Sequence, residues 1–242
     1  MNIKACTGFY LILSIISIAF LLLIACGDKP EPPTNPDTSS SGIELIVLGT
    51  VQDAGSPHID CQKSCCASLR KSPDPTRKVV SLGIIDHLAQ KKYLIEASPD
   101  ITAQLTILRK SATFSDSDIP DAVFITHAHI GHYTGLMYFG REAKGAQSVP
   151  IYVHKRMAGF LKTNVTPWSQ LIDLDNIQLR AMVPGKAIAL DNILVQSMLV
   201  PQRDEYSETA CFIIKGPNKK VLFIPDIDKW ERWSVDINEI IS

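Results

Sequence analysis

Three of the six histidines in this chain stand within six residues, directly after a short apolar segment, and no other feature constrains the fold as much. Residues 122–126 are apolar and β-prone, which is typical of a buried strand. In an extended segment alternate side chains point the same way, so His127 and His129 can reach one point from one side. Gly131 then turns the chain and brings in His132 from another direction. Because neutral imidazole is a common metal ligand, the pattern predicts a metal site; three unrelated surface histidines are the alternative.

The beginning of the chain predicts a leader and a tether. Lys4 gives a positive start, residues 9–25 are apolar, and Cys26 follows a small residue. This order resembles a bacterial lipoprotein signal over residues 1–26, in which Cys26 becomes the lipidated first residue after cleavage. An uncleaved transmembrane anchor is the alternative, since the apolar run is near the ~17-residue lower limit for spanning. Residues 27–42 are rich in Pro and Ser and predict an extended tether.

The predicted leader indicates where the protein is located, and the charge of the chain indicates which classes of partner to expect. We expect a lipid-anchored domain in the cell envelope, outside the cytoplasm, at the periplasmic or outer-membrane face. Residues 43–242 are long enough for one domain with a sizeable core. The net charge is −1 and there is no long basic block, so nucleic acid is not an expected partner. The sequence predicts no oligomeric state.

The cysteines predict a second metal site. Cys61, Cys65 and Cys66 stand in one loop, and three thiolates at this spacing suit a structural zinc with a fourth ligand from elsewhere. The candidates for that fourth ligand are His58, Asp60 and Cys211. A disulfide is one alternative, because disulfides are the default outside the cytoplasm, although adjacent cysteines bridge only with strain. Free thiols are the other alternative.

The rest of the domain alternates strands and helices. The expected strands are residues 43–48, 79–86, 91–96, 122–126, 151–154, 177–182, 188–190, 193–200, 211–215 and 221–224. The expected helices are residues 101–109, which Asp100 can cap, 135–145 and 156–162. Two strand-rich halves with interspersed helices predict an α+β fold or a layered αββα sandwich, and not a doubly wound sheet.

Four segments together resemble the metallo-β-lactamase-fold proteins, and more narrowly the branch that includes the pyrroloquinoline quinone biosynthesis B protein. They are the glycine loop at residues 47–55, the cysteine loop, the Ala-Ser-Pro-Asp segment at residues 97–100, and His127-x-His129-x-Gly131-His132. The resemblance covers nearly all of residues 43–242. It implies a four-layer αββα sandwich that holds metals at one edge of the paired sheets.

The resemblance also implies a catalytic centre in which one or two metal ions activate a water. It assigns His127, His129, His132 and Asp226 as metal ligands, with Asp226 and His132 as the catalytic residues. Asp226 follows an expected strand and matches the position of a bridging aspartate; a turn carboxylate that caps the next segment is the alternative. Zinc is the expected metal, with iron or manganese as alternatives.

The chain departs from the family pattern at three places. Gly131 stands where the histidine motif has an aspartate, so the centre is expected to lose a carboxylate ligand. Gln202 stands where a later histidine is expected, and a carboxamide suits zinc less well than imidazole. The sequence ends at Ser242, before the final strand, helix and histidine of the fold, so we expect a C-terminally incomplete sandwich.

These observations predict a membrane-tethered, metal-dependent hydrolase. Its substrate would be a small molecule with an ester, amide, thioester or phosphate bond. One alternative is a protein like the pyrroloquinoline quinone biosynthesis B protein, which handles or oxidises a quinone precursor. The other alternative is a degenerate, non-catalytic lipoprotein that binds a metal or a ligand, because a fold does not fix a function.

Overall fold

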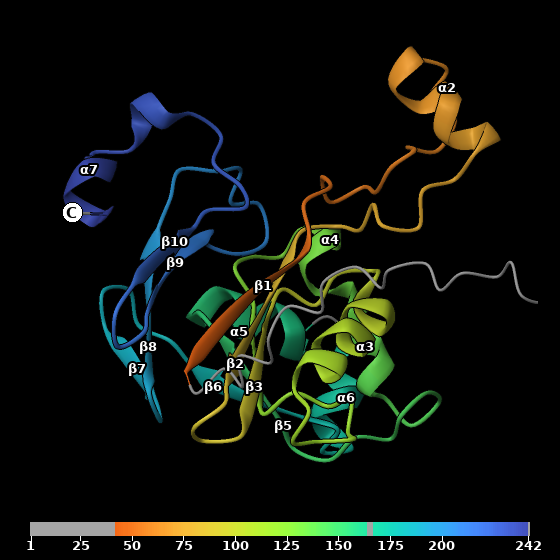
Figure 1. Cartoon of the computed structure of the whole chain (residues 1–242). Coiled ribbons are helices and arrows are strands. Elements are labelled where there is room, and N and C mark those ends of the chain that lie inside the picture. The colour runs from red at the N-terminus through yellow and green to blue at the C-terminus, as the bar shows by residue number, and fades with distance from the viewer. Residues whose placement is uncertain (1–41, 164–166, 242) are drawn as a thin grey trace, which may run out of the picture. The chain divides into compact units, whose positions relative to one another are not determined.

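The structure is a computed structural model that describes residues 42–163 and 167–241 (Figure 1). The predicted signal, residues 1–26, and nearly all of the predicted tether, residues 27–42, lie outside these described residues. Within the described part of the chain, no helix combines the length and the apolar character that crossing a membrane requires.

Six strands form the first sheet, in the order β1-β2-β3-β4-β5-β6. Their bounds are β1 Ile43–Gly49, β2 Ser81–Asp86, β3 Lys91–Ile95, β4 Ala122–Phe124, β5 Val149–Val153 and β6 Ile177–Ala181. The first three strands pair antiparallel, whereas β3, β4, β5 and β6 run parallel. β2 is buried along its whole length, as expected for a strand covered on both faces.

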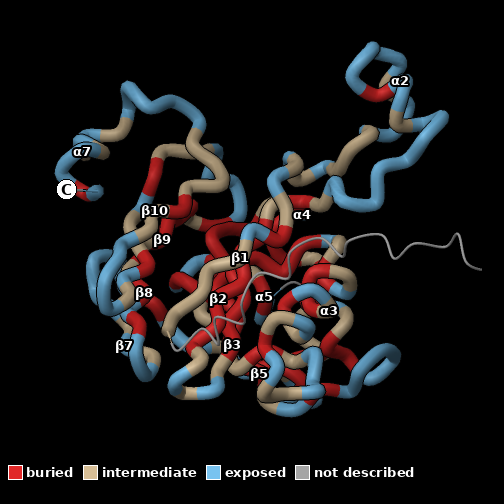
Figure 2. The backbone as a smooth tube through the Cα atoms, in the orientation of Figure 1, coloured by how far each residue is buried: buried red, intermediate tan, exposed pale blue. Residues whose placement is uncertain are grey.

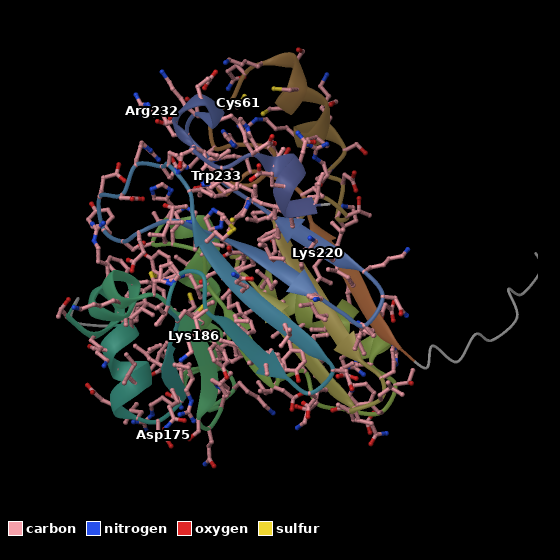
Figure 3. All side chains as sticks on the ribbon, turned by 90° about the vertical axis from the view of Figure 1, so that its left-hand side faces the viewer. Cys61, Asp175, Lys186, Lys220, Arg232 and Trp233 are labelled. Carbon is pink, nitrogen blue, oxygen red and sulfur yellow. The ribbon has the colours of Figure 1, made fainter. Side chains whose placement is uncertain are left out.

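The second sheet has four antiparallel strands, in the order β10-β9-β8-β7. Their bounds are β7 Ala187–Leu190, β8 Ile193–Leu199, β9 Ala210–Lys215 and β10 Lys220–Phe223. Burial alternates along β8, because one face of this sheet packs inward and the other faces out. Figure 3 looks onto this sheet, with Lys220 labelled at the start of β10.

Helices cover the face of the first sheet that points away from the second sheet. They are α3 Ile101–Ser111, α4 Ile130–Tyr133, the 3-10 helix η1 Thr134–Phe139, α5 Lys155–Thr163 and α6 Trp168–Asp173. Among the described elements, α7 (Ile237–Ile241) contacts β10 on the second sheet. The resulting order of helices, sheet, sheet and helix agrees with the predicted αββα sandwich.

Two segments project from the end of the sheets at which α4 lies (Figures 1 and 3). One contains α2 (Ser64–Lys71) with the labelled Cys61, and the other contains η2 (Trp230–Arg232) with the labelled Trp233. Both segments are mostly exposed, whereas β2, β3 and β4 of the first sheet are mostly buried (Figure 2). Cys66 is the one buried residue of α2.

Aromatic side chains fill the space between the two sheets. Phe124 of β4 is 0% exposed and stacks on Tyr152 of β5, with ring centroids 4.6 Å apart. It also meets the edge of Phe212 from β9 in the second sheet, at 5.9 Å. The central strand of the first sheet is thereby fixed against the second sheet at the point where it leads into the histidines.

Hydrogen bonds join the two sheets at the end opposite the histidines. Asp86 is fully buried at the end of β2 and accepts hydrogen bonds from the main chain and the side chain of Asn192, which lies in the β7–β8 turn. Tyr93 of β3 donates its hydroxyl to Asp191 Oδ2 in the same turn, at 3.1 Å. These contacts fix the alignment of the sheets independently of the histidine-bearing end.

The local predictions were wrong at three places. The helix expected over residues 135–145 is a 3-10 helix that ends at Phe139, followed by turns that close at Gly145, whose φ is +58°. Asp100 lies at the start of α3 but makes no side-chain cap; its carboxylate accepts the Val79 N–H at 2.8 Å instead. The helices α2, α4, α6 and α7 were not predicted, because each of them is short.

We expect Phe124→Ala to lower the free energy of unfolding by about 3–5 kcal/mol, because it opens a cavity between the sheets. Urea denaturation followed by tryptophan fluorescence measures this change. The control is Leu88→Ala, since Leu88 is 61% exposed and its truncation leaves no cavity. Equal effects from the two substitutions would contradict the packing described here.

Candidate metal centre

The candidate site lies where the parallel strands of the first sheet end. The carboxyl ends of neighbouring parallel strands meet at one edge, and here Glu96 follows β3, His127 follows β4 and His154 follows β5. The turn of α4 carries His132 back to this edge. Asp226 comes from the second sheet, three residues after the end of β10. The site therefore spans both sheets.

The four predicted residues of the catalytic centre meet at one carboxylate oxygen. Asp226 Oδ2 lies 3.2 Å from His127 Nε2, 3.7 Å from His129 Nδ1 and 3.6 Å from His132 Nε2. His127 Nε2 and His129 Nδ1 are themselves 2.9 Å apart. One donor atom each of His127, His129 and Asp226 forms a group within 4.8 Å, which His132 approaches through Asp226.

The other nitrogen of each imidazole faces a separate polar side chain. The three pairs are His127 Nδ1 with Thr126 Oγ1 at 2.8 Å, His129 Nε2 with Glu205 Oε2 at 3.3 Å, and His132 Nδ1 with Glu96 Oε2 at 3.5 Å. Such outer partners fix which nitrogen carries a proton and how each ring is turned. The arrangement leaves one nitrogen of every ring directed at the shared point.

Glu96 was missed by the sequence analysis. It is 0% exposed, and neither of its carboxylate oxygens has a hydrogen-bond partner among the described residues. Its φ is +70°, an uncommon conformation for a side chain of this size. A buried, unsatisfied carboxylate on strained backbone is retained mainly at functional sites. The one sequence signal was its position, at the end of a strand next to the histidine-bearing strand.

Charge in this cluster favours a cation. Burial lowers the pKa of His127, which keeps its ring neutral and able to bind a metal. The imidazoles of His127 and His132 beside Asp226 hold the pKa of this carboxyl far below its usual range, so it is ionised. Burial opposes the charged form of His132, but Glu96 and Asp226 outweigh burial and raise its pKa to about 10. Glu96 and Asp226 thus favour a proton on His132. A metal ion at the same place could supply this positive charge instead.

The donor set fits a divalent metal ion. A tetrahedral ion with bonds of about 2.0–2.1 Å separates its ligand atoms by roughly 3.4 Å. The facing atoms of His127, His129 and Asp226 are 2.9–3.7 Å apart, so an ion requires only small side-chain shifts. Imidazole and carboxylate donors suit zinc and also iron or manganese. His132 also favours a bound ion, because both of its buried nitrogens lack a hydrogen bond among the described residues.

A loop from residues 200–209 closes one side of the site. Ser207 accepts the Ala128 N–H at 2.8 Å, and this contact ties the loop to the turn between His127 and His129. Gln202, where a histidine was expected, uses its side-chain oxygen to accept the Arg203 N–H at 2.9 Å. The residue at position 202 therefore serves its own loop and not the cluster.

The cysteine loop forms a second group of possible ligands. The sulfur atoms of Cys61, Cys65 and Cys66 all lie within 4.8 Å of one another, and the last two are 3.9 Å apart. A tetrahedral zinc with bonds of about 2.3 Å separates its sulfur ligands by roughly 3.8 Å. The described cysteines are free thiols and not disulfides. This spacing fits a metal held by three thiolates.

The three predicted candidates for a fourth ligand lie outside the group of three sulfur atoms. His58 Nε2 lies 2.9 Å from Gln52 Oε1, and Asp60 accepts a hydrogen bond from Gln62. Cys211 is fully buried in β9, and burial raises the pKa of its thiol to about 11. Cys211 is therefore a core residue, and none of the three candidates belongs to the group of three sulfur atoms.

The chain is similar in sequence and structure to known proteins. Residues 91–240 match the family described as Beta-lactamase superfamily domain. An octanoyltransferase from Porphyromonas gingivalis (strain ATCC BAA-308 / W83) is 37% identical over 94 residues, which are 39% of this chain and 17% of that protein.

Two solved structures are similar to this chain. Zn(2+)-bound PqqB from Methylobacterium extorquens superposes with a TM-score of 0.58 and 18% identity, over 76% of this chain and 65% of that chain. The metallo-beta-lactamase fold protein YhfI from Bacillus subtilis has a TM-score of 0.49 and 12% identity, over 75% of this chain and 61% of that chain. This chain thus covers less than two thirds of each of the three relatives.

We expect Glu96→Gln to weaken binding of a divalent metal about 10–100-fold, because His132 loses the carboxylate that orients its ring. Isothermal titration with Zn²⁺ measures the affinity. Glu231→Gln is the control, since Glu231 is exposed in η2. Equal affinities for the two variants would show that Glu96 does not support the metal centre.

Proposed function

The chain belongs to the beta-lactamase superfamily, and on this premise we propose that it is a metal-dependent hydrolase of small molecules. The observation that carries the proposal is the convergence of three imidazole nitrogens on Asp226 Oδ2, at 3.2–3.7 Å. Each ring is also held from behind by a separate group, which is how metal-binding histidines are usually prepared.

A bound divalent ion, for which we propose zinc with iron or manganese as alternatives, supplies the chemistry by lowering the pKa of a water and polarising the bond under attack. In this proposal His127, His129, His132 and Asp226 hold the metal. Asp226 is ionised and also orients the attacking water by accepting its hydrogen bond. His132 stands between two carboxylates and fixes the direction of Asp226. The bond cleaved is an ester, amide, thioester or phosphate.

We expect His129→Ala to remove about one equivalent of bound metal and to lower ester turnover at least about 100-fold, because a ligand atom is lost from the centre. Cys65→Ser is the matched comparison, and it should remove metal from the cysteine loop while the histidine centre keeps its metal. Elemental analysis of the purified proteins, together with a panel of chromogenic esters and phosphates, measures both effects.

The same pair of variants separates the hydrolase from the degenerate alternative. Metal that survives His129→Ala but disappears with Cys65→Ser would mean that only the cysteine loop binds a metal. Metal at the histidine centre without turnover of any substrate class would favour a binding protein.

A second candidate is a function like that of the pyrroloquinoline quinone biosynthesis B protein. It is favoured by the fold shared with Zn(2+)-bound PqqB and by the three clustered thiols. This candidate predicts oxygen uptake with an ortho-diphenol probe, whereas the hydrolase predicts ester or phosphate turnover without oxygen uptake.

We also propose that the domain is lipid-anchored through Cys26, at the extracytoplasmic side of the cell envelope. The proposal rests on the sequence alone, because residues 1–41 lie outside the described residues. Cys26→Ser is expected to move the protein from the membrane fraction to the soluble fraction, as immunoblotting can measure. Cys6→Ser, a change within the same leader, should leave it in the membrane. A membrane-bound Cys26→Ser variant would favour the uncleaved anchor.

A further inference from the structure

Gly131 is a glycine because another residue fills the space of its side chain. Gly131 is buried in the short helix α4, between His129 and His132. A Cβ added there would lie 2.1 Å from Asp53 Cβ and 2.4 Å from Asp53 Cα. Real Cβ atoms do not approach other atoms so closely, so any side chain at position 131 would displace the main chain of residue 53. Asp53, from the loop after β1, thus packs directly on the histidine-bearing turn.

The carboxylate of Asp53 starts from the place that a side chain at position 131 would have occupied. A carboxylate oxygen lies about 2.4 Å from its own Cβ, so rotation of the Asp53 side chain can bring it next to α4. Asp53 is half-buried. Among the described residues, neither a hydrogen bond nor an ion pair holds this carboxylate, so it can turn toward a ligand.

His132 presents a nitrogen that no hydrogen bond from a described residue satisfies. His132 Nε2 is fully buried, lacks a hydrogen bond among the described residues and lies 3.6 Å from Asp226 Oδ2. It stands outside the close group made by His127, His129 and Asp226. A second cation next to Asp226 on the His132 side would satisfy this nitrogen but needs another anionic donor.

We propose that Asp53 is this donor, so that His132, Asp226 and Asp53 hold a second divalent cation beside the one held by His127, His129 and Asp226. His132 then binds this second cation and not the first. The inference rests on the proposed metal centre. It also revises the expectation that Gly131 deprives the centre of a carboxylate, because the contact between Asp53 and Gly131 brings a carboxylate to the same turn from a different segment.

Cobalt titration of the full chain tests the proposal, with Co²⁺ alone as the probe. Thiolate-to-cobalt charge-transfer bands report the cysteine loop, and the weaker d–d bands report the histidine centre. We expect the wild type to take up about two equivalents at the histidine centre. Asp53→Asn is expected to lose one of these equivalents, or to bind it at least about tenfold more weakly. The control Asp116→Asn, in the exposed loop before β4, should titrate like the wild type.

The outcomes separate this inference from the proposed function. Identical titrations of Asp53→Asn and Asp116→Asn would overturn the role of Asp53 and leave the histidine centre in place. Unchanged d–d bands in His129→Ala would overturn both proposals. Asp53→Ala serves as a second variant, and thermal melting in chelator shows whether each variant is folded. Loss of one equivalent in both folded Asp53 variants supports the assignment.

Discussion

The shared oxygen of Asp226 is the point on which the rest of the site depends. Three imidazoles approach it from one short turn, at 3.2–3.7 Å, while the carboxylate itself arrives from the other sheet. This meeting requires the end of β4, the turn of α4 and the segment after β10 to be aligned together. Packing of Phe124 against Phe212 supplies that alignment, because it fixes one sheet against the other just before the histidines.

The electrostatics of the cluster follow from the same arrangement. Glu96 and Asp226 flank His132 within 3.5–3.6 Å, and His132 and Glu96 are withdrawn from water. Two carboxylates on opposite sides of one buried imidazole favour a positive charge between them. A proton on His132 provides that charge in the protein alone, and a cation can take over the same task. The strained backbone of Glu96 is consistent with selection for this site over local stability.

The sequence predicted the parts of the site that depend on local spacing. Alternation along a strand placed His127 and His129 on one side, and the Cys61, Cys65 and Cys66 spacing brought three sulfur atoms together. The sandwich and the position of Asp226 came from the resemblance to a family. The role of Glu96 could not be predicted, because burial and a positive φ arise only from tertiary packing. The contact between Asp53 and Gly131 was hidden for a similar reason, since it joins segments far apart in the chain.

The two ends of the sandwich are held together by different interactions. Hydrogen bonds join the sheets at the end opposite the histidines. Asp86 and Tyr93 hold the β7–β8 turn through direct hydrogen bonds to Asn192 and Asp191. The opposite end closes around donors that repel one another unless a positive charge lies among them. Hydrogen bonds therefore hold the two sheets together at one end, and charge interactions hold them together at the other. If the histidine cluster holds a metal as proposed, chelation would loosen this end of the sandwich first, and unfolding would begin there.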